Sequence, residues 1–113
     1  MPLNRKINLA QTDEEIQNCY SVMAELRPHI FADEFLARVK RQMSKSDYKL
    51  VYLNDKGVKA VGGFRVSEWI SGGKYLEIED LAVKDGERSK GYGGELFDWI
   101  VELRGAKTAT KLN

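Results

Sequence analysis

Apolar and polar residues in the first part of the chain follow one short strand pattern and then a helix pattern. Residues 5–9 alternate weakly between polar and apolar side chains, which predicts a first strand. Thr12 then stands three residues before Glu15, the spacing of a capping box at the start of a helix. The apolar residues that follow at helical spacing are Ile16, Cys19, Tyr20, Met23 and Leu26. We expect one helix here, ended by Pro28, with Cys19 buried on its apolar side.

A second amphipathic helix is expected to begin near Asp33. Its apolar side carries Phe35, Leu36, Val39 and Met43. Its opposite side is basic and carries Arg38, Lys40, Arg41 and Lys45. We interpret this basic side as a surface that faces water, because runs of charge along a helix are most often solvated.

The second half of the chain favours strands separated by turns, followed by a helix. Strand-forming residues fill segments 48–53, 58–70 and 75–83, and turn signals separate them at 54–57 and 71–74. These three strands are expected to form an antiparallel meander. A helix pattern over residues 91–104 ends at Gly105. Residues 108–112 are expected to begin one more strand, parallel to its neighbour because a crossover helix precedes it.

The element order β-α-α-β-β-β-α-β predicts an α/β fold of the α+β kind, in a single domain over residues 1–113. A chain of 113 residues with 42% hydrophobic and 31% charged residues can form one packed core. Its net charge of +1 attracts neither nucleic acid nor an anionic membrane, and no apolar run is long enough to span a bilayer. One cysteine excludes an internal disulfide, and no secretory leader is apparent, so we expect a cytoplasmic protein. One cysteine with one histidine also argues against structural zinc.

The segment most suggestive of chemistry lies between the third meander strand and the helix that follows. It consists of Arg88, Ser89, Lys90, Gly91, Tyr92, Gly93 and Gly94. The first N–H groups of a helix have no partner within it and carry partial positive charge, so anions bind there. The glycines let a phosphate approach the backbone, and Arg88 and Lys90 add positive charge. This segment therefore predicts a site for a diphosphate.

The motif type narrows the choice of ligand. The P-loop pattern is absent, and Leu96 stands where the dinucleotide fingerprint needs a small residue. The pattern R-x-x-G-x-G after the strand at residues 77–83 instead resembles the acyl-CoA-binding motif of the GNAT superfamily of N-acetyltransferases. The resemblance extends in element order over essentially the whole chain and implies a GNAT-like mixed sheet. It also implies acetyl-CoA as cosubstrate without a metal, with loop amides on its diphosphate and Leu81, Ala82 and Val83 along its pantetheine arm.

Acetylation of an amine requires a base that takes a proton from the ammonium group before nitrogen attacks the thioester. Strand alternation places Glu77, Glu79, Leu81 and Val83 on one face, and Ile78, Asp80 and Ala82 on the other. By resemblance, Glu77 matches the strand glutamate that acts as base in some family members. Glu79 lies closer to the thioester end, so both are candidate catalytic residues. Asp80 is expected to be structural, capping the loop or binding a basic side chain.

Two other interpretations stay open, a non-catalytic acyl-CoA-binding module or regulatory subunit, and an interaction domain whose loop binds nothing. The family continues beyond the last predicted strand, so the chain resembles an incomplete member that lacks the C-terminal elements. The general acid, usually a downstream tyrosine, belongs to that part. An uncovered sheet edge would favour pairing, which predicts a homodimer. The expected acceptor is a small-molecule or peptide amine that the sequence does not identify, and His29 is a candidate for lining its entrance.

Overall fold

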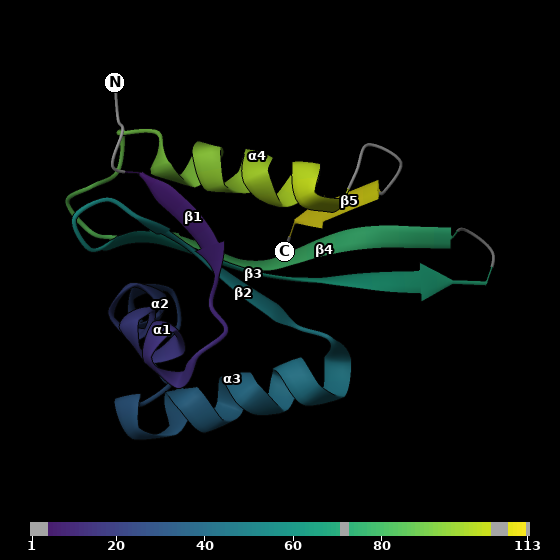
Figure 1. Cartoon of the computed structure of the whole chain (residues 1–113), viewed down its shortest axis with the longest axis horizontal. Helices are drawn as coiled ribbons and strands as arrows, with labels where there is room; N and C mark the ends of the chain where they lie inside the picture. The colour runs from purple at the N-terminus through teal and green to yellow at the C-terminus, as the bar shows by residue number, and fades with distance from the viewer. Residues whose placement is uncertain (1–4, 71–72, 105–108, 113) are drawn as a thin grey trace.

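The computed structural model describes residues 5–70, 73–104 and 109–112, which form a sheet with helices on both faces (Figure 1). The strands are β1 (Lys6–Leu9), β2 (Lys49–Asn54), β3 (Val58–Trp69), β4 (Gly73–Val83) and β5 (Ala109–Leu112), in this order across the sheet. Strands β1 to β4 pair antiparallel, and β5 pairs parallel with β4. The predicted mixed sheet and its meander are therefore confirmed.

The helices are α1 (Asp13–Asn18), α2 (Tyr20–Leu26), α3 (Ala32–Ser46) and α4 (Tyr92–Arg104). Helix α4 covers one face of the sheet, and α1, α2 and α3 cover the other (Figure 1). None of the helices in the described part of the chain is both long and apolar enough to cross a membrane.

The predicted first helix is two helices in the structure. The capping box is confirmed, since the Glu15 N–H donates to Thr12 Oγ1 (3.1 Å) and the Thr12 N–H donates to Glu15 Oε1 (3.0 Å). The prediction of one continuous helix is wrong, because Cys19 separates α1 from α2. The Cys19 N–H donates to the Ile16 carbonyl three residues earlier (3.0 Å), a tighter turn than the α-helix uses. Burial raises the pKa of the Cys19 thiol to about 12, as expected for a packed cysteine rather than a reactive one.

Two core clusters lie on opposite faces of the sheet. The cluster under α1, α2 and α3 includes Ile16, Val22, Phe35, Leu50, Val61 and Ala82. The cluster under α4 includes Val51, Phe64, Leu76, Ile78, Leu96 and Ile100. Gly62 lets α4 approach β3 closely, because a Cβ atom there would lie 3.0 Å from Ile100 Cδ1. The sheet is thus a middle layer with an apolar core on each side.

Strand β4 contains a bulge that changes the predicted alternation of its side chains. In the ladder with β3, Gly63 lies opposite Asp80 and Phe64 lies opposite Ile78, so Glu79 is an extra residue. The prediction that Ile78 and Ala82 share a face is wrong, because they belong to the two different cores. The bulge shifts the pattern by one position from Asp80 onward, so this strand presents two successive acidic residues, Glu79 and Asp80, to the same side.

The residues after the bulge change sides accordingly. Leu81 and Val83 pack against the α4-side core with Ile78, so they do not share a face with Glu77 and Glu79 as predicted. Glu79 and Asp80 both lie toward α2 and α3, where they line one cavity. A single inserted residue therefore brings carboxylates to the helix layer and apolar side chains to the α4 layer.

Candidate functional site

A cavity of about 480 Å³ lies where the end of β4 and the loop before α4 face the end of α2. We call it the loop cavity. It is lined by Glu25, Leu26, Leu81, Ala82, Val83, Glu87, Arg88, Ser89, Gly91, Tyr92, Gly93 and Gly94. Every residue predicted to contact the coenzyme is therefore at this cavity except Lys90. Strand and loop residues meet here because the loop over residues 84–91 leads the chain back from the end of β4 to the start of α4.

The backbone of the loop is arranged as an anion site requires. Ser89 and Gly91 have positive φ angles of 77° and 82°, which turn the chain sharply into α4. The Glu95 N–H donates to the Gly91 carbonyl (3.0 Å), so the amides of residues 92–94 precede the first intrahelical bond. Among the hydrogen bonds that the described residues make, none uses an amide of residues 88–94 as donor. These amides remain available to a ligand.

Glycine at position 93 also has a packing reason. A Cβ atom there would lie 3.1 Å from Val83 Cγ2, so a side chain would push the loop away from β4. Gly91 has open space around it but a backbone angle that side chains disfavour. The two glycines thus keep the loop close to the strand for different reasons.

The two basic side chains of the loop differ in their surroundings. Lys90 Nζ pairs with Glu87 (2.5 Å), and Lys59 also approaches Glu87 (3.4 Å). These two ammonium groups lower the pKa of Glu87, with the Lys90 hydrogen bond as the main cause. Arg88 is 66% exposed at the cavity rim, and its contacts with Glu25 (3.9 Å) and Asp85 (3.5 Å) are too long for hydrogen bonds. Arg88 is therefore the cation better placed for a bound phosphate.

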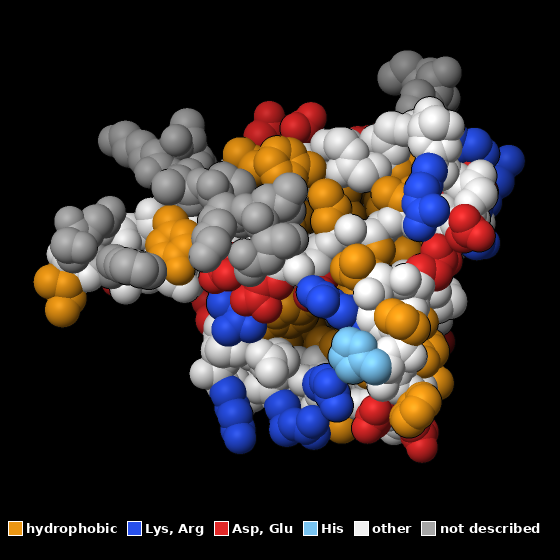
Figure 2. All heavy atoms as spheres, turned by 180° about the vertical axis from the view of Figure 1, so that it is seen from behind, with side chains coloured by type: hydrophobic (Ala, Val, Ile, Leu, Met, Phe, Trp, Pro, Cys, Tyr) orange, Lys and Arg blue, Asp and Glu red, His pale blue; other side chains and the backbone are white. Residues whose placement is uncertain are grey.

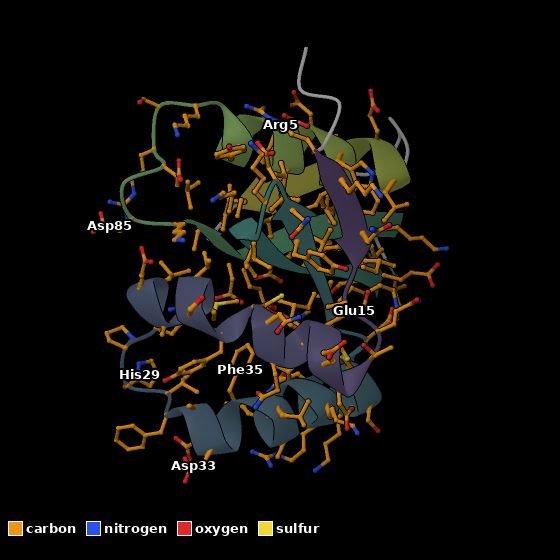
Figure 3. All side chains as sticks on the ribbon, turned by 60° about the vertical axis from the view of Figure 1, so that its left-hand side comes forward. Arg5, Glu15, His29, Asp33, Phe35 and Asp85 are labelled. Carbon is orange, nitrogen blue, oxygen red and sulfur yellow. The ribbon has the colours of Figure 1, made fainter. Side chains whose placement is uncertain are left out.

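A cluster of Arg5, Asp55, Tyr92 and Glu95 lies behind the loop and fixes the start of α4. The sequence analysis did not predict it. The buried Tyr92 side chain points into the protein, where its Oη donates to Asp55 Oδ2 (2.9 Å). The Arg5 guanidinium lies 4.4 Å from the Tyr92 ring centre and donates to Glu95 Oε1 (2.6 Å). Figure 3 shows Arg5 where β1 passes the start of α4. The Asp55 hydrogen bond raises the pKa of Tyr92. Tyr92 can therefore offer a ligand its amide but not its hydroxyl.

One edge of β4 is uncovered next to the loop cavity. Strand β5 pairs with β4 only from Tyr75 to Ile78 (Figure 1). Over residues 79–83, the only strand of the described chain that pairs with β4 is β3, on its other edge. Backbone N–H and C=O groups on such an edge are free to bond an extended ligand, as they would bond a neighbouring strand.

A second cavity, of about 280 Å³, opens between α2, α3 and the bulge of β4. We call it the helix cavity. It is lined by Met23, Arg27, His29, Ile30, Phe35, Arg38, Val39, Gln42, Tyr48, Glu79 and Asp80. Figure 2 shows a hollow with an apolar floor and charged side chains around its mouth, and Figure 3 shows His29 on the segment between α2 and α3. His29, the candidate for lining the entrance of the acceptor, therefore does line a cavity.

The two cavities adjoin each other along the chain. Leu26 lines the loop cavity and Arg27 the helix cavity, and likewise Leu81 and Asp80 on β4. A ligand extended along β4 from the loop would therefore reach the helix cavity at the bulge.

Arg27 and Tyr48 fasten the bulge. Arg27 Nε donates to Asp80 Oδ1 (2.9 Å), and its Nη2 donates to the Glu79 carbonyl (3.2 Å). Tyr48 Oη donates to Asp80 Oδ2 (2.8 Å), and burial beside Asp80 raises the pKa of Tyr48 well above its usual value. Glycine at position 63 makes space for the Tyr48 hydroxyl, since a Cβ atom there would lie 1.8 Å from Tyr48 Oη. The prediction that Asp80 binds a basic side chain is confirmed.

The two candidate bases lie toward the same helix layer but not equally close to the cavity. Glu79 lines the helix cavity, and Arg65 Nη2 donates to its Oε1 (3.1 Å). Glu77 lies opposite Arg65 in the β3–β4 ladder and does not line either cavity. Of the two, Glu79 is thus the carboxylate that a ligand in the helix cavity can touch.

Arg38 corrects the interpretation of the basic side of α3. It was predicted to face water, but it is half-buried and lines the helix cavity. Its Nε is buried and makes no hydrogen bond within the described part of the chain. Arg38 follows Phe35 by three positions and precedes Val39, so it stands at the border of the apolar side. That position was the available signal, and the packing of α3 beside α2 and β4, which closes the cavity around Arg38, decided the outcome.

Comparison with known families gives one clear match. The model of the Acetyltransferase (GNAT) family matches residues 10–111. A curated relative, the uncharacterized N-acetyltransferase YhdJ of Bacillus subtilis (strain 168), is 33% identical over 87 residues. That alignment covers 76% of this chain and 61% of the relative, so the chain spans about three fifths of the relative's length.

Solved structures show the same fold at low sequence identity. A GNAT family acetyltransferase from Staphylococcus aureus superposes with a TM-score of 0.82 at 19% identity, covering 97% of this chain and 86% of the other. Glucosamine-6-phosphate N-acetyltransferase from Arabidopsis thaliana superposes with a TM-score of 0.71 at 18% identity, covering 96% and 81%. At these identities the likeness concerns the fold, and the chemistry must be argued from the residues of this chain.

Proposed function

The chain belongs to the GNAT acetyltransferase family, and on that premise we propose that it binds acetyl-CoA in the loop cavity and transfers the acetyl group to an amine. The observation that carries the proposal is the continuous path from the loop amides, along the uncovered edge of β4, to the bulge. Acetyl-CoA has three parts that fit this path in order.

The diphosphate fits the start of α4, where the free amides of residues 92–94 and Arg88 supply positive charge. The pantetheine arm carries amide groups, which can pair with the β4 backbone over residues 81–83 as a short strand would. The thioester then lies at the bulge, beside Glu79 and Asp80.

In the proposed reaction the amine enters through the helix cavity and attacks the thioester carbon. An N–C bond forms, the C–S bond breaks, and the thiolate of CoA leaves and takes up a proton. Glu79 accepts the proton of the incoming ammonium, directly or through a water, because it lines the cavity where the amine would stand. Glu77 is the second candidate for this role. Polar backbone groups at the bulge can stabilise the negative charge that develops on the carbonyl oxygen.

One observation favours the alternative of a non-catalytic acyl-CoA-binding module. Arg65 contacts both oxygens of the Glu79 carboxylate, so this carboxylate is already engaged and less open to an incoming ammonium group. Acetyl-CoA binding without acetyl transfer would be the result of such an arrangement. The test must therefore measure binding and transfer separately.

The test combines calorimetric titration with acetyl-CoA and a thiol-release assay over a panel of amines. We expect saturable binding, and transfer that falls about 100-fold in Glu79→Gln, the range typical of a general base. Glu77→Gln tests the second candidate on the same strand: retained activity in this variant assigns the base to Glu79, and a comparable loss in Glu77→Gln alone assigns it to Glu77. Binding with no thiol release from any amine supports the non-catalytic module, and the absence of binding at millimolar acetyl-CoA refutes both. The buried Cys19 thiol should give little background in this assay.

A further inference from the structure

We propose that the acceptor is a small amine that also carries an anionic group, a carboxylate or a phosphate, and that Arg38 binds this group in the helix cavity. This inference rests on the proposed acetyl transfer for the role of the amine. The anion site itself follows from the charges that line the cavity.

The charged groups of the helix cavity are paired except for one. Asp80 is bonded by Arg27 and by Tyr48, and Glu79 is bonded by Arg65. Arg38 is the remaining guanidinium of the lining, and within the described residues it has neither a carboxylate partner nor an acceptor for its buried Nε–H. A half-buried guanidinium without a partner is unfavourable in the empty cavity, and a bound anion would supply the missing charge.

The walls around Arg38 strengthen its attraction for an anion. Met23, Ile30, Phe35 and Val39 supply apolar surface in the same cavity. Apolar walls lower the local dielectric constant, so a charge pair formed there is stronger than one at the surface. His29 lies at the mouth and adds an imidazole ring that can hydrogen-bond an anion.

The cavity is polarised in a direction that would orient such a ligand. Its β4 side carries the carboxylates Glu79 and Asp80, and its α3 side carries Arg38. Both carboxylates have an arginine partner and Arg38 has none, so the anion is attracted to α3, and the amine of the same molecule is left facing β4 and the proposed thioester position. The volume of about 280 Å³ is near the lower limit for small-molecule sites, so the ligand is small.

Matched pairs of amines test this proposal. β-Alanine is compared with its amide, and phosphoethanolamine with ethanolamine, so that each pair differs by one anionic group and the two pairs separate carboxylate from phosphate. We expect kcat/KM to be about 10- to 100-fold higher for the anionic member of at least one pair, as a charge-assisted hydrogen bond predicts. No preference for either anionic member overturns the proposal.

Variants of α3 assign the effect to Arg38. Arg38→Met should remove the preference by raising KM for the anionic amine, while the neutral amine and acetyl-CoA affinity change less than about twofold, because their proposed contacts do not include Arg38. Arg38→Lys should restore part of the preference. Arg41→Met, on the exposed side of the same helix, is the matched control and should behave as the wild type. Equal losses for anionic and neutral amines in Arg38→Met would overturn the assignment.

Direct titration separates this inference from the proposed function. Calorimetry with β-alanine or phosphoethanolamine, in the presence and absence of CoA, measures anion binding without acetyl transfer. Binding that Arg38→Met abolishes supports the anion site even if no thiol is released, whereas the transfer proposal alone then fails. Absence of binding by both probes, in an enzyme that acetylates neutral amines, refutes the anion site and leaves the transfer proposal intact.

Discussion

The loop cavity and the helix cavity lie next to each other on β4 but are built from different parts of the chain. The loop cavity comes mainly from backbone groups and glycines of one continuous segment, the end of β4 and the loop before α4. The helix cavity comes from side chains of α2, of the segment between α2 and α3, of α3 and of β4, with Tyr48 just before β2. A site made of main-chain amides depends on local conformation, whereas a site made of side chains depends on how distant elements pack.

Behind each cavity lies a similar cluster, in which a tyrosine hydroxyl donates to an aspartate and an arginine lies beside the pair. We call each cluster the support of its cavity. Tyr92 Oη donates to Asp55 Oδ2 (2.9 Å) behind the loop cavity, and Tyr48 Oη donates to Asp80 Oδ2 (2.8 Å) behind the helix cavity. Arg5 lies against the first pair and Arg27 against the second. Changes in one support should therefore affect one cavity and spare the other, and the predictions below use this difference.

The largest expected effect is on the backbone of the loop cavity. Gly91→Val places a side chain at a φ of 82°, which costs about 1–3 kcal/mol for residues other than glycine and displaces the amides from the diphosphate. We expect acetyl-CoA affinity to fall at least about 10-fold in calorimetric titration, because each 1.4 kcal/mol is tenfold. Gly73→Val, at a φ of 76° at the far end of β4, is the control for strain. An equal loss of affinity in both variants would contradict the loop assignment.

A second variant acts on the helix cavity instead. Gly63→Ala would put its Cβ 1.8 Å from Tyr48 Oη and 2.8 Å from Asp80 Oδ2, so the support of the bulge must move. We expect the free energy of unfolding in urea to fall by about 1–3 kcal/mol, as for other overpacked sites, with acetyl-CoA affinity largely kept. Gly94→Ala has open space around its Cβ and lies in α4, so its stability should not fall. Unchanged stability in Gly63→Ala would show that the bulge tolerates the displacement.

Removing one hydroxyl from each support gives a smaller and more selective effect. Tyr92→Phe and Tyr48→Phe should each lower the free energy of unfolding by about 1 kcal/mol, the typical value of one hydrogen bond. Tyr92→Phe should weaken acetyl-CoA binding and leave the acceptor KM unchanged, and Tyr48→Phe should do the reverse. Titration and steady-state kinetics on both variants measure this crossover. Identical profiles for the two variants would mean that the supports are not separate.

The smallest expected effect concerns how the free energy of unfolding falls at low pH, and it compares Glu15 in the helix layer with Glu87 at the loop cavity. Hydrogen bonds from the Thr12 and Gln11 amides and from the Tyr52 hydroxyl lower the pKa of Glu15, beside the helix layer, to about 2. Lys90 and Lys59 lower the pKa of Glu87, beside the loop cavity, to a lesser extent. Because both folded pKa values lie below the unfolded value, each group stabilises the fold above about pH 4.5, and this contribution is lost as pH falls through the folded pKa.

Urea midpoints measured between about pH 5 and pH 2 check this expectation. Glu15→Gln should flatten the decline in stability over this window more than Glu87→Gln does. A steeper residual decline in Glu15→Gln than in Glu87→Gln would show that the Glu15 hydrogen bonds are weaker than their geometry indicates.

The regions that sequence reasoning predicted well are those governed by local interactions. The capping box of Thr12 and Glu15 joins residues three positions apart, and the structure contains it. The predicted glycine-rich segment does line the loop cavity, because the backbone angles at Ser89 and Gly91 determine the shape of the loop. The predictions were wrong for features that depend on segments distant in the sequence. The bulge at Glu79 is visible only from the pairing with β3, and the burial of Arg38 depends on how α3 lies against the sheet.

The amino-acid sequence by itself determined the order of the strands, the start of the first helix and the turn that exposes amides before α4, because residues within a few positions of each other decide these features. Only the tertiary structure decided which carboxylate enters a cavity, which arginine faces it, and what holds the loop in place. Those outcomes rest on contacts such as Arg27 with Asp80 and Arg5 with Glu95, whose partners lie 53 and 90 positions apart. No local pattern encodes such pairs, because they form only when the sheet brings the segments together.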